Sequence, residues 1–129
     1  MPGEPTLSIL IVDDEPQFVD VLADVLRRSG HTVHGITDPA AALKSTESTT
    51  YDVLVLDMFM PGMSGSEFFA ELQRRGSVLV ERTVVVCGYL TPQVRAAFPD
   101  VPDHAFLQKP FSILELRRLL EELVSGKQS

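Results

Sequence analysis

The segment LSILIVDDEP, residues 7–16, joins a short apolar run directly to three acidic residues and a proline. The run at 7–12 is aliphatic and rich in β-branched residues, which predicts a buried strand. Pro16 suits the first turn of a helix, where its missing N–H costs nothing. The apolar residues that follow recur at helical spacing, at Phe18, Leu22, Val25 and Leu26. A buried strand followed at once by an amphipathic helix is the unit from which α/β folds are built.

The same unit recurs four more times along the chain. Further strands are predicted at 31–36, 52–56, 83–87 and 104–107. Helices are predicted to begin at Asp38-Pro39, at the capping boxes Ser64–Glu67 and Ser112–Glu115, and at Thr91-Pro92. Prolines at 99 and 102 predict that the helix after the fourth strand is short. The fold class is therefore α/β: a (βα)5, doubly wound, five-stranded parallel sheet between two layers of helices.

Length and composition place one domain at residues 7–124, between a tail at 1–6 and a tail or linker at 125–129. Lys and Arg number 11 and Asp and Glu 18, giving a net charge of −7 that argues against binding to nucleic acid or to anionic membranes. The single cysteine, Cys87, excludes an internal disulfide. No secretory signal or membrane span is recognisable, so a cytoplasmic location is expected.

Ligands of open α/β sheets bind beyond the carboxyl ends of the strands. Asp13 and Asp14 follow the first predicted strand, Asp57 ends the third, Cys87 ends the fourth and Lys109 follows the fifth. Each has an ordinary explanation alone, since acids before helices complement the helix dipole and most lysines are solvated. Their joint position at one sheet edge indicates a functional site instead.

The chemistry of that edge is predicted from its residue types. Neighbouring carboxylates repel unless a cation lies among them, and an all-oxygen cluster suits Mg²⁺. A carboxylate beside Mg²⁺ and an ammonium group is placed to attack phosphorus and form an acyl phosphate. No glycine-rich phosphate loop follows the first strand, which argues against a nucleotide-binding fold.

Three motifs, in this order, resemble the receiver domain of two-component response regulators over residues 7–124. They are VDDEP (12–16), DMFMPGMSG (57–65) and KPF (109–111). The segments GYLTP (88–92) and FLQKPF (106–111) are similar to receivers of hybrid sensor kinases. The resemblance implies a flavodoxin-like three-layer sandwich with strand order 2-1-3-4-5.

The resemblance also implies site roles. Asp57 is expected to be the phosphoacceptor, Asp14 to bind Mg²⁺ directly and Asp13 largely through water, with the backbone carbonyl of Phe59 as a further metal ligand. Lys109 is expected to contact the phosphoryl group.

The remaining implied features concern switching and partners. Lys109 is expected to form a cis peptide with Pro110, and Phe106 matches the aromatic switch position. The phosphodonor would be a sensor histidine kinase or a histidine phosphotransfer protein. The chain would catalyse its own phosphorylation and dephosphorylation rather than act as a turnover enzyme. Because few residues lie outside 7–124, two expectations stay open: the signal passes to a protein partner, or the chain is one piece of a longer protein. The expected docking surface is the face of strands 4 and 5 with the helix at 112–124.

Cys87 departs from the resemblance, because the family usually has Ser or Thr there to bond the phosphoryl group. A thiol is a weak donor and a thiolate would repel phosphate. Three interpretations stay open: a tolerated small buried residue, an altered conformational response, or redox sensing, which has no second cysteine to support it.

Two other functions compete with that of a phosphorylated receiver. A degenerate receiver that binds partners without phosphorylation is favoured only by Cys87. A Mg²⁺-dependent phosphohydrolase usually needs a second Asp two residues after its nucleophile, where this chain has Phe59.

Two local hypotheses concern bulky residues near Asp57. Phe59 and Tyr89 are expected to flank Asp57 and to screen its phosphoryl group from water. An exposed adaptable patch for a partner is expected at Met58, Phe59, Met60 and Met63, with filling of the core rim as the competing explanation.

Overall fold

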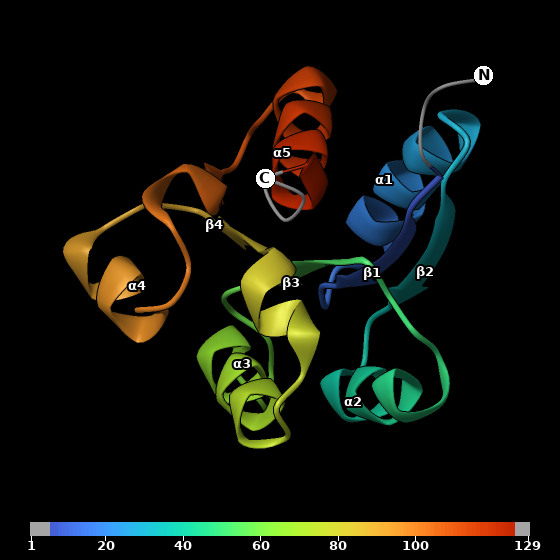
Figure 1. Cartoon of the computed structure of the whole chain (residues 1–129). Helices are drawn as coiled ribbons and strands as arrows, with labels where there is room; N and C mark the ends of the chain where they lie inside the picture. Colours follow the sequence, from blue (N-terminus) through green and yellow to red (C-terminus); the bar gives the residue numbers. More distant parts are fainter. Residues whose placement is uncertain (1–5, 126–129) are drawn as a thin grey trace.

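Five strands and five α-helices alternate along the chain, as the sequence predicts (Figure 1). The computed structural model describes residues 6–125, so the predicted tails lie outside it except for Thr6 and Ser125. The strands are β1 (Ser8–Val12), β2 (Thr32–Ile36), β3 (Val53–Asp57), β4 (Thr83–Cys87) and β5 (Phe106–Gln108). The α-helices are α1 (Pro16–Arg28), α2 (Pro39–Ser48), α3 (Gly65–Arg74), α4 (Pro92–Ala97) and α5 (Ile113–Ser125).

The strands form one parallel sheet in the order β2-β1-β3-β4-β5. The chain therefore moves outward from β1 to β2, returns, and continues in the other direction through β3 to β5. The order reverses between β1 and β3, which confirms the predicted doubly wound, flavodoxin-like topology. This reversal is the place where α/β sheets bind ligands.

Helices cover both faces of the sheet, with α1 and α5 on one face and α2, α3 and α4 on the other (Figure 1). Alternate residues of each strand point to opposite layers. On β3, Val53 and Val55 pack with α1 and α5, whereas Leu54 and Leu56 pack with the other layer. Because both of their faces are buried, the inner strands β1, β3 and β4 are largely apolar without a polar alternation, whereas the edge strand β2 is mostly exposed.

Helices α2 to α5 begin where the sequence predicts, because a side chain at the start of each accepts from a free backbone N–H group. The capping box of α3 is complete, with Ser64 Oγ accepting from the N–H of Glu67 and Glu67 Oε1 accepting from the N–H of Ser64. Ser112 and Glu115 make the same reciprocal pair before α5. Helix α3 follows β3, and α5 follows the segment of Lys109. The two capping boxes therefore fix the backbone just after Asp57 and Lys109.

The predicted fifth strand is wrong at its start. His104 and Ala105 belong to a 3₁₀ helix, Asp103–Ala105, and β5 begins at Phe106. Pro102 precedes this turn, and its carbonyl accepts from the N–H of Ala105 at 2.9 Å, so the backbone is committed to a turn rather than to the sheet.

Two other elements refine the prediction. A 3₁₀ helix at Val78–Arg82, absent from the predicted elements, leads into β4, and Ser77 caps it through the N–H of Leu79. Helix α4 is short as predicted, with 6 residues. None of the helices in the range 6–125 is long and apolar enough to cross a membrane.

Candidate functional site

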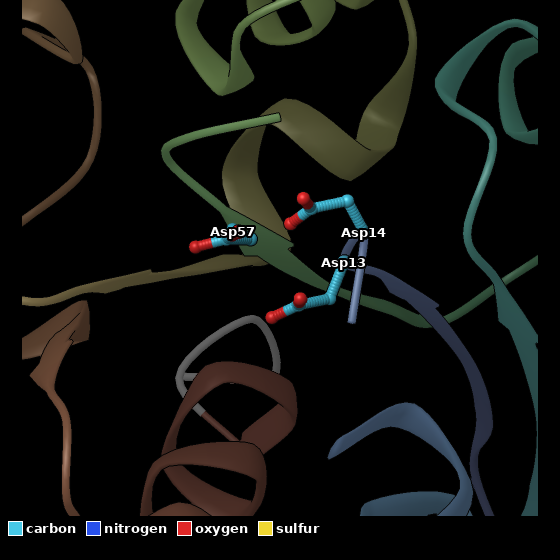
Figure 2. Close-up of side chains that lie close together, drawn as sticks. All are labelled: Asp13, Asp14 and Asp57. Atoms are coloured by element: carbon cyan, nitrogen blue, oxygen red, sulfur yellow. The ribbon is translucent and has the colours of Figure 1, made fainter. Parts of the chain in front are cut away.

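The carboxyl ends of β1 and β3 bring three aspartates together. Asp13 and Asp14 follow β1 directly, and Asp57 is the last residue of β3. One carboxylate oxygen from each lies within 4.8 Å of those of the other two (Figure 2). The neighbouring parallel strands β1 and β3 thus place residues 44 positions apart in one cluster, at the reversal of strand order.

These carboxylates are removed from water to different degrees. Asp13 is 1% exposed and Asp57 is 8% exposed, whereas Asp14 is half-buried. Burial, together with the charge of Asp13, raises the pKa of Asp57 to about 7, while Lys109 opposes the change. Burial also raises the pKa of Asp13, against hydrogen bonds from the Glu15 N–H and Lys109. The cluster therefore carries more negative charge than its own surroundings neutralise.

A magnesium ion fits this donor set. All three side chains offer hard carboxylate oxygens, and no nitrogen or sulfur ligand takes part in the cluster that the described residues form. A divalent cation would relieve the repulsion between the carboxylates, and the half-buried position of Asp14 leaves an approach from solvent.

Gly65, the first residue of α3, allows this helix to begin in close contact with the end of β3. A Cβ atom at this position would lie 2.4 Å from the carbonyl oxygen of Asp57 and 2.9 Å from Cα of Met58. The N–H of Gly65 donates to the carbonyl of Met58 at 2.8 Å, so the start of α3 lies against the strand end. Only glycine allows this close approach, which fixes the backbone that carries Asp57.

Lys109 follows β5 directly, and the peptide bond between it and Pro110 is cis. Its Nζ donates to Asp13 Oδ2 at 3.2 Å and to Glu15 Oε1 at 3.0 Å. Within the described part of the chain, the ion pairs of Lys109 are with these two residues and not with Asp57. The ammonium group therefore reaches the site through Asp13.

Cys87 ends β4 and is 1% exposed. Its Sγ lies 3.8 Å from the carbonyl oxygen of Leu107, to which the thiol donates. Burial, with the nearby Asp57 charge, raises the pKa of the thiol, so the group stays protonated. The thiol is a weak donor that already has an acceptor on β5.

Phe106, at the predicted switch position, is 7% exposed and packs edge-on against Phe98, with ring centroids 6.2 Å apart. The guanidinium of Arg95 lies over its ring, 5.9 Å from the centroid. Arg95 also pairs with Asp103, in the 3₁₀ turn before β5. The ring is thus enclosed by residues from α4 and the segments on either side of the turn.

The methionines after Asp57 do not form the expected exposed patch. Met60 is buried, and Met58 and Met63 are half-buried against the core beneath α3. The apolar layer around α3 draws these side chains inward, so filling of the core rim is the better explanation. Phe59 and Tyr89 are 66% and 79% exposed.

Sequence reasoning identified the aspartates, the lysine and the cysteine, but it gave no role to Glu15 or Phe18. Both contact the Lys109 ammonium, Glu15 through an ion pair and Phe18 through its ring, whose centroid lies 4.3 Å from Nζ. The position of Glu15 within the VDDEP motif, directly after the two aspartates, is the feature of the sequence that could have indicated its role.

Comparison with known proteins gives one consistent family. Residues 9–121 match the family model described as response regulator receiver domain. The chain is 33% identical over 117 residues to the transcriptional regulatory protein TcrA of Mycobacterium tuberculosis, covering 91% of this chain and 46% of TcrA. It is 30% identical over 119 residues to the sensor histidine kinase AruS of Pseudomonas aeruginosa, covering 91% of this chain and 12% of AruS. The chain spans less than half the length of these curated relatives.

A solved structure agrees with the fold. The response regulator protein TrrA of Thermotoga maritima, in complex with Mg²⁺ and BeF, superposes with a TM-score of 0.78 at 26% identity. The match covers 92% of this chain and 99% of that one.

Proposed function

The chain belongs to the response regulator receiver domain family of two-component signalling, and from this premise we propose that Asp57 is its phosphoacceptor. The observation that carries the proposal is the cluster of Asp13, Asp14 and Asp57 at the reversal of strand order, with Lys109 paired to Asp13. This set combines a nucleophile, a cation site and a fixed positive charge.

In the proposed step, a carboxylate oxygen of Asp57 attacks the phosphorus of a phosphohistidine on a sensor kinase or phosphotransfer protein. A P–O bond forms while the P–N bond breaks, and the imidazole leaves with the electron pair and takes up a proton. Hydrolysis of the acyl phosphate later returns Asp57 and inorganic phosphate. Asp57 must be ionised to attack, and its pKa of about 7 makes a nearby cation important for this.

Magnesium would be held by Asp14 directly, by Asp13 largely through water, and by Asp57 and the backbone carbonyl of Phe59. It would neutralise charge on the phosphoryl oxygens during transfer. Lys109 adds a second positive charge beside Asp13. Because its side chain is partly buried, the electrostatic interactions of this charge are stronger than they would be in open water.

The response is proposed to travel through β4 and β5. Phe106 changes its packing, and the partner reads the surface of β4, β5 and α5. Cys87 makes this response weaker than a hydroxyl would, because its thiol donates poorly and lies toward Leu107.

The test is intact mass after incubation with acetyl phosphate, with and without Mg²⁺. One phosphoryl group per chain is expected, dependent on Mg²⁺ and lost in Asp57→Ala. Asp20→Ala is the matched control, because Asp20 is an exposed acid on α1. No adduct from acetyl phosphate or from a phosphorylated histidine donor would overturn the proposal and favour a binding module that is not phosphorylated.

A further inference from the structure

The Lys109 ammonium is held by three side chains from the start of α1 and the residues before it. Its Nζ is 3.0 Å from Glu15 Oε1, 3.2 Å from Asp13 Oδ2 and 4.3 Å from the centroid of the Phe18 ring. The lysine side chain is 26% exposed. These contacts all lie on the α1 side of the site, and none of the ion pairs of Lys109 in the described residues reaches Asp57.

The Glu15 carboxylate has no other structural task in this segment. Glu15 is the N-cap residue of α1, but its side chain accepts no capping hydrogen bond. It also lies outside the cluster of three carboxylates that suits a cation. Its contact with Lys109 is therefore separable from helix capping and from the metal site.

Phe18 gives the ammonium a fixed surface. Its ring packs edge-on against Phe111, with centroids 6.1 Å apart and an angle of 83° between the ring planes. Phe111 lies two residues after Lys109, so the same loop that carries the lysine also fixes the ring beneath it. A cation over an aromatic face is attracted by the electron density of the ring.

If Lys109 is to contact a phosphoryl group on Asp57, as the family resemblance implies, its ammonium must leave its present partners, which are Asp13 and Glu15. A cation bound at the cluster would weaken the ion pair between Asp13 and Lys109, because it shares the charge of Asp13. The contacts of Lys109 with Glu15 and Phe18 would stay. We propose that Glu15 and Phe18 are positioning residues that hold the Lys109 ammonium on the α1 side and thereby slow phosphorylation of Asp57. The inference rests on the proposed function of Asp57.

The size of the effect follows from the exposure of the pair. The Glu15 side chain is 64% exposed, so its ion pair is of the weak, solvent-screened kind. Removing it is expected to speed phosphorylation about two- to fivefold. Phe18→Leu keeps an apolar side chain, loses the aromatic face, and is expected to act in the same direction by about twofold.

The experiment compares the initial rate of phosphorylation of wild type and Glu15→Gln by acetyl phosphate. Mg²⁺ is kept saturating for each protein, since Glu15 also contributes negative charge near the cation. Asp20→Asn is the control, because it removes one exposed acid from the same helix without touching Lys109. The expected result is faster phosphorylation in Glu15→Gln and no change in Asp20→Asn.

A second readout follows the lysine itself. The rate at which an amine-reactive reagent labels Lys109 is measured by peptide mass, relative to the exposed Lys44 in the same sample. Glu15→Gln is expected to raise this ratio in the unphosphorylated protein, and Asp20→Asn is not.

The outcomes separate the two proposals. Wild type that accepts no phosphoryl group would overturn the function of Asp57. If Glu15→Gln is phosphorylated no faster than wild type, the holding role is overturned while the function of Asp57 stands. This holds even if Lys109 is labelled faster in Glu15→Gln. Faster phosphorylation without faster labelling would also overturn it, because the charge of Glu15 would then act without holding the lysine.

Discussion

The two halves of the carboxyl edge of the sheet differ in how completely they carry the residues that the family resemblance implies. At the ends of β1 and β3, Asp13, Asp14 and Asp57 form one cluster on strands of 5 residues each. At the ends of β4 and β5, Cys87 takes the place where the family resemblance implies Ser or Thr, and β5 has 3 residues. We call these the acceptor half and the response half.

The difference suggests that accepting a phosphoryl group and responding to it depend on separate residues. The acceptor half keeps each acid that the family resemblance implies, whereas the response half has a thiol that donates to Leu107 and a short α4. Changes in one half should therefore leave the other half's property largely intact.

The largest expected effect is a loss of stability caused by a substitution that disturbs the backbone of the acceptor half. Gly65→Val places a Cβ where only 2.4 Å separates it from the carbonyl oxygen of Asp57, so α3 must move away from β3. The expected loss of stability is about 3 kcal/mol, measured by urea unfolding. Phosphorylation by acetyl phosphate should fall with it.

Gly88→Val is the matched control, because a Cβ at Gly88 meets no atom within 4 Å. It lies in the response half and should cost much less. Equal costs at the two positions would contradict the idea that the close contact at Gly65 fixes Asp57.

The next effect concerns charge in the acceptor half. The pKa of Asp57 is raised to about 7 in the folded protein, from 3.8, so the folded state binds the proton more tightly than the unfolded state. This stabilisation is fully present below pH 3.8 and is lost as pH rises through 7. In Mg²⁺-free buffer, the free energy of unfolding should fall by about 2–3 kcal/mol between pH 5 and pH 8.

Asp57→Asn should remove most of this fall and stabilise the protein at pH 8, and Mg²⁺ should stabilise wild type far more than the variant. The measurement is urea unfolding over pH, with the exposed-acid variant Asp20→Asn as control. A wild-type stability that rises from pH 5 to pH 8 without Mg²⁺ would contradict the electrostatic description of the cluster.

The smallest expected effect lies where the halves meet. Phe59 is expected to restrict water at the acyl phosphate, but its 66% exposure limits the screening. Phe59→Asn should shorten the phosphoryl half-life by about threefold, equal to about 0.6 kcal/mol in activation free energy. Loss of label is followed by intact mass after the donor is removed. An unchanged half-life would sink the screening hypothesis.

Much of the fold could be predicted because its signals are local. Apolar strands, capping boxes such as Ser64–Glu67 and the prolines around α4 each depend on neighbouring residues. The 3₁₀ helices were missed or misplaced because short turns carry weak periodicity. Ala105 is apolar enough for a strand, but the hydrogen bond from its N–H to the carbonyl of Pro102 keeps it in a turn.

The site divides in the same way. Strand ends predict that Asp13, Asp57 and Lys109 share an edge, because parallel strands bring their carboxyl ends together. The partner of Lys109 could not be predicted, since three nearby acids compete for it and side-chain packing decides. The sequence leaves open whether Met60 is exposed or fills the rim of the core, and the apolar layer formed by α3 decides for the core.

The separation of the two halves is tested most directly by amide NMR spectra of wild type and Cys87→Thr, each with Mg²⁺ and beryllium fluoride as a stand-in for the phosphoryl group. Both proteins should show shifts around Asp57 and Asp14. Shifts at α4 and Phe106 should be small in wild type and several-fold larger in Cys87→Thr. Equally large shifts at α4 and Phe106 in the two proteins would contradict the account, because a thiol at position 87 would then transmit the signal as well as a hydroxyl.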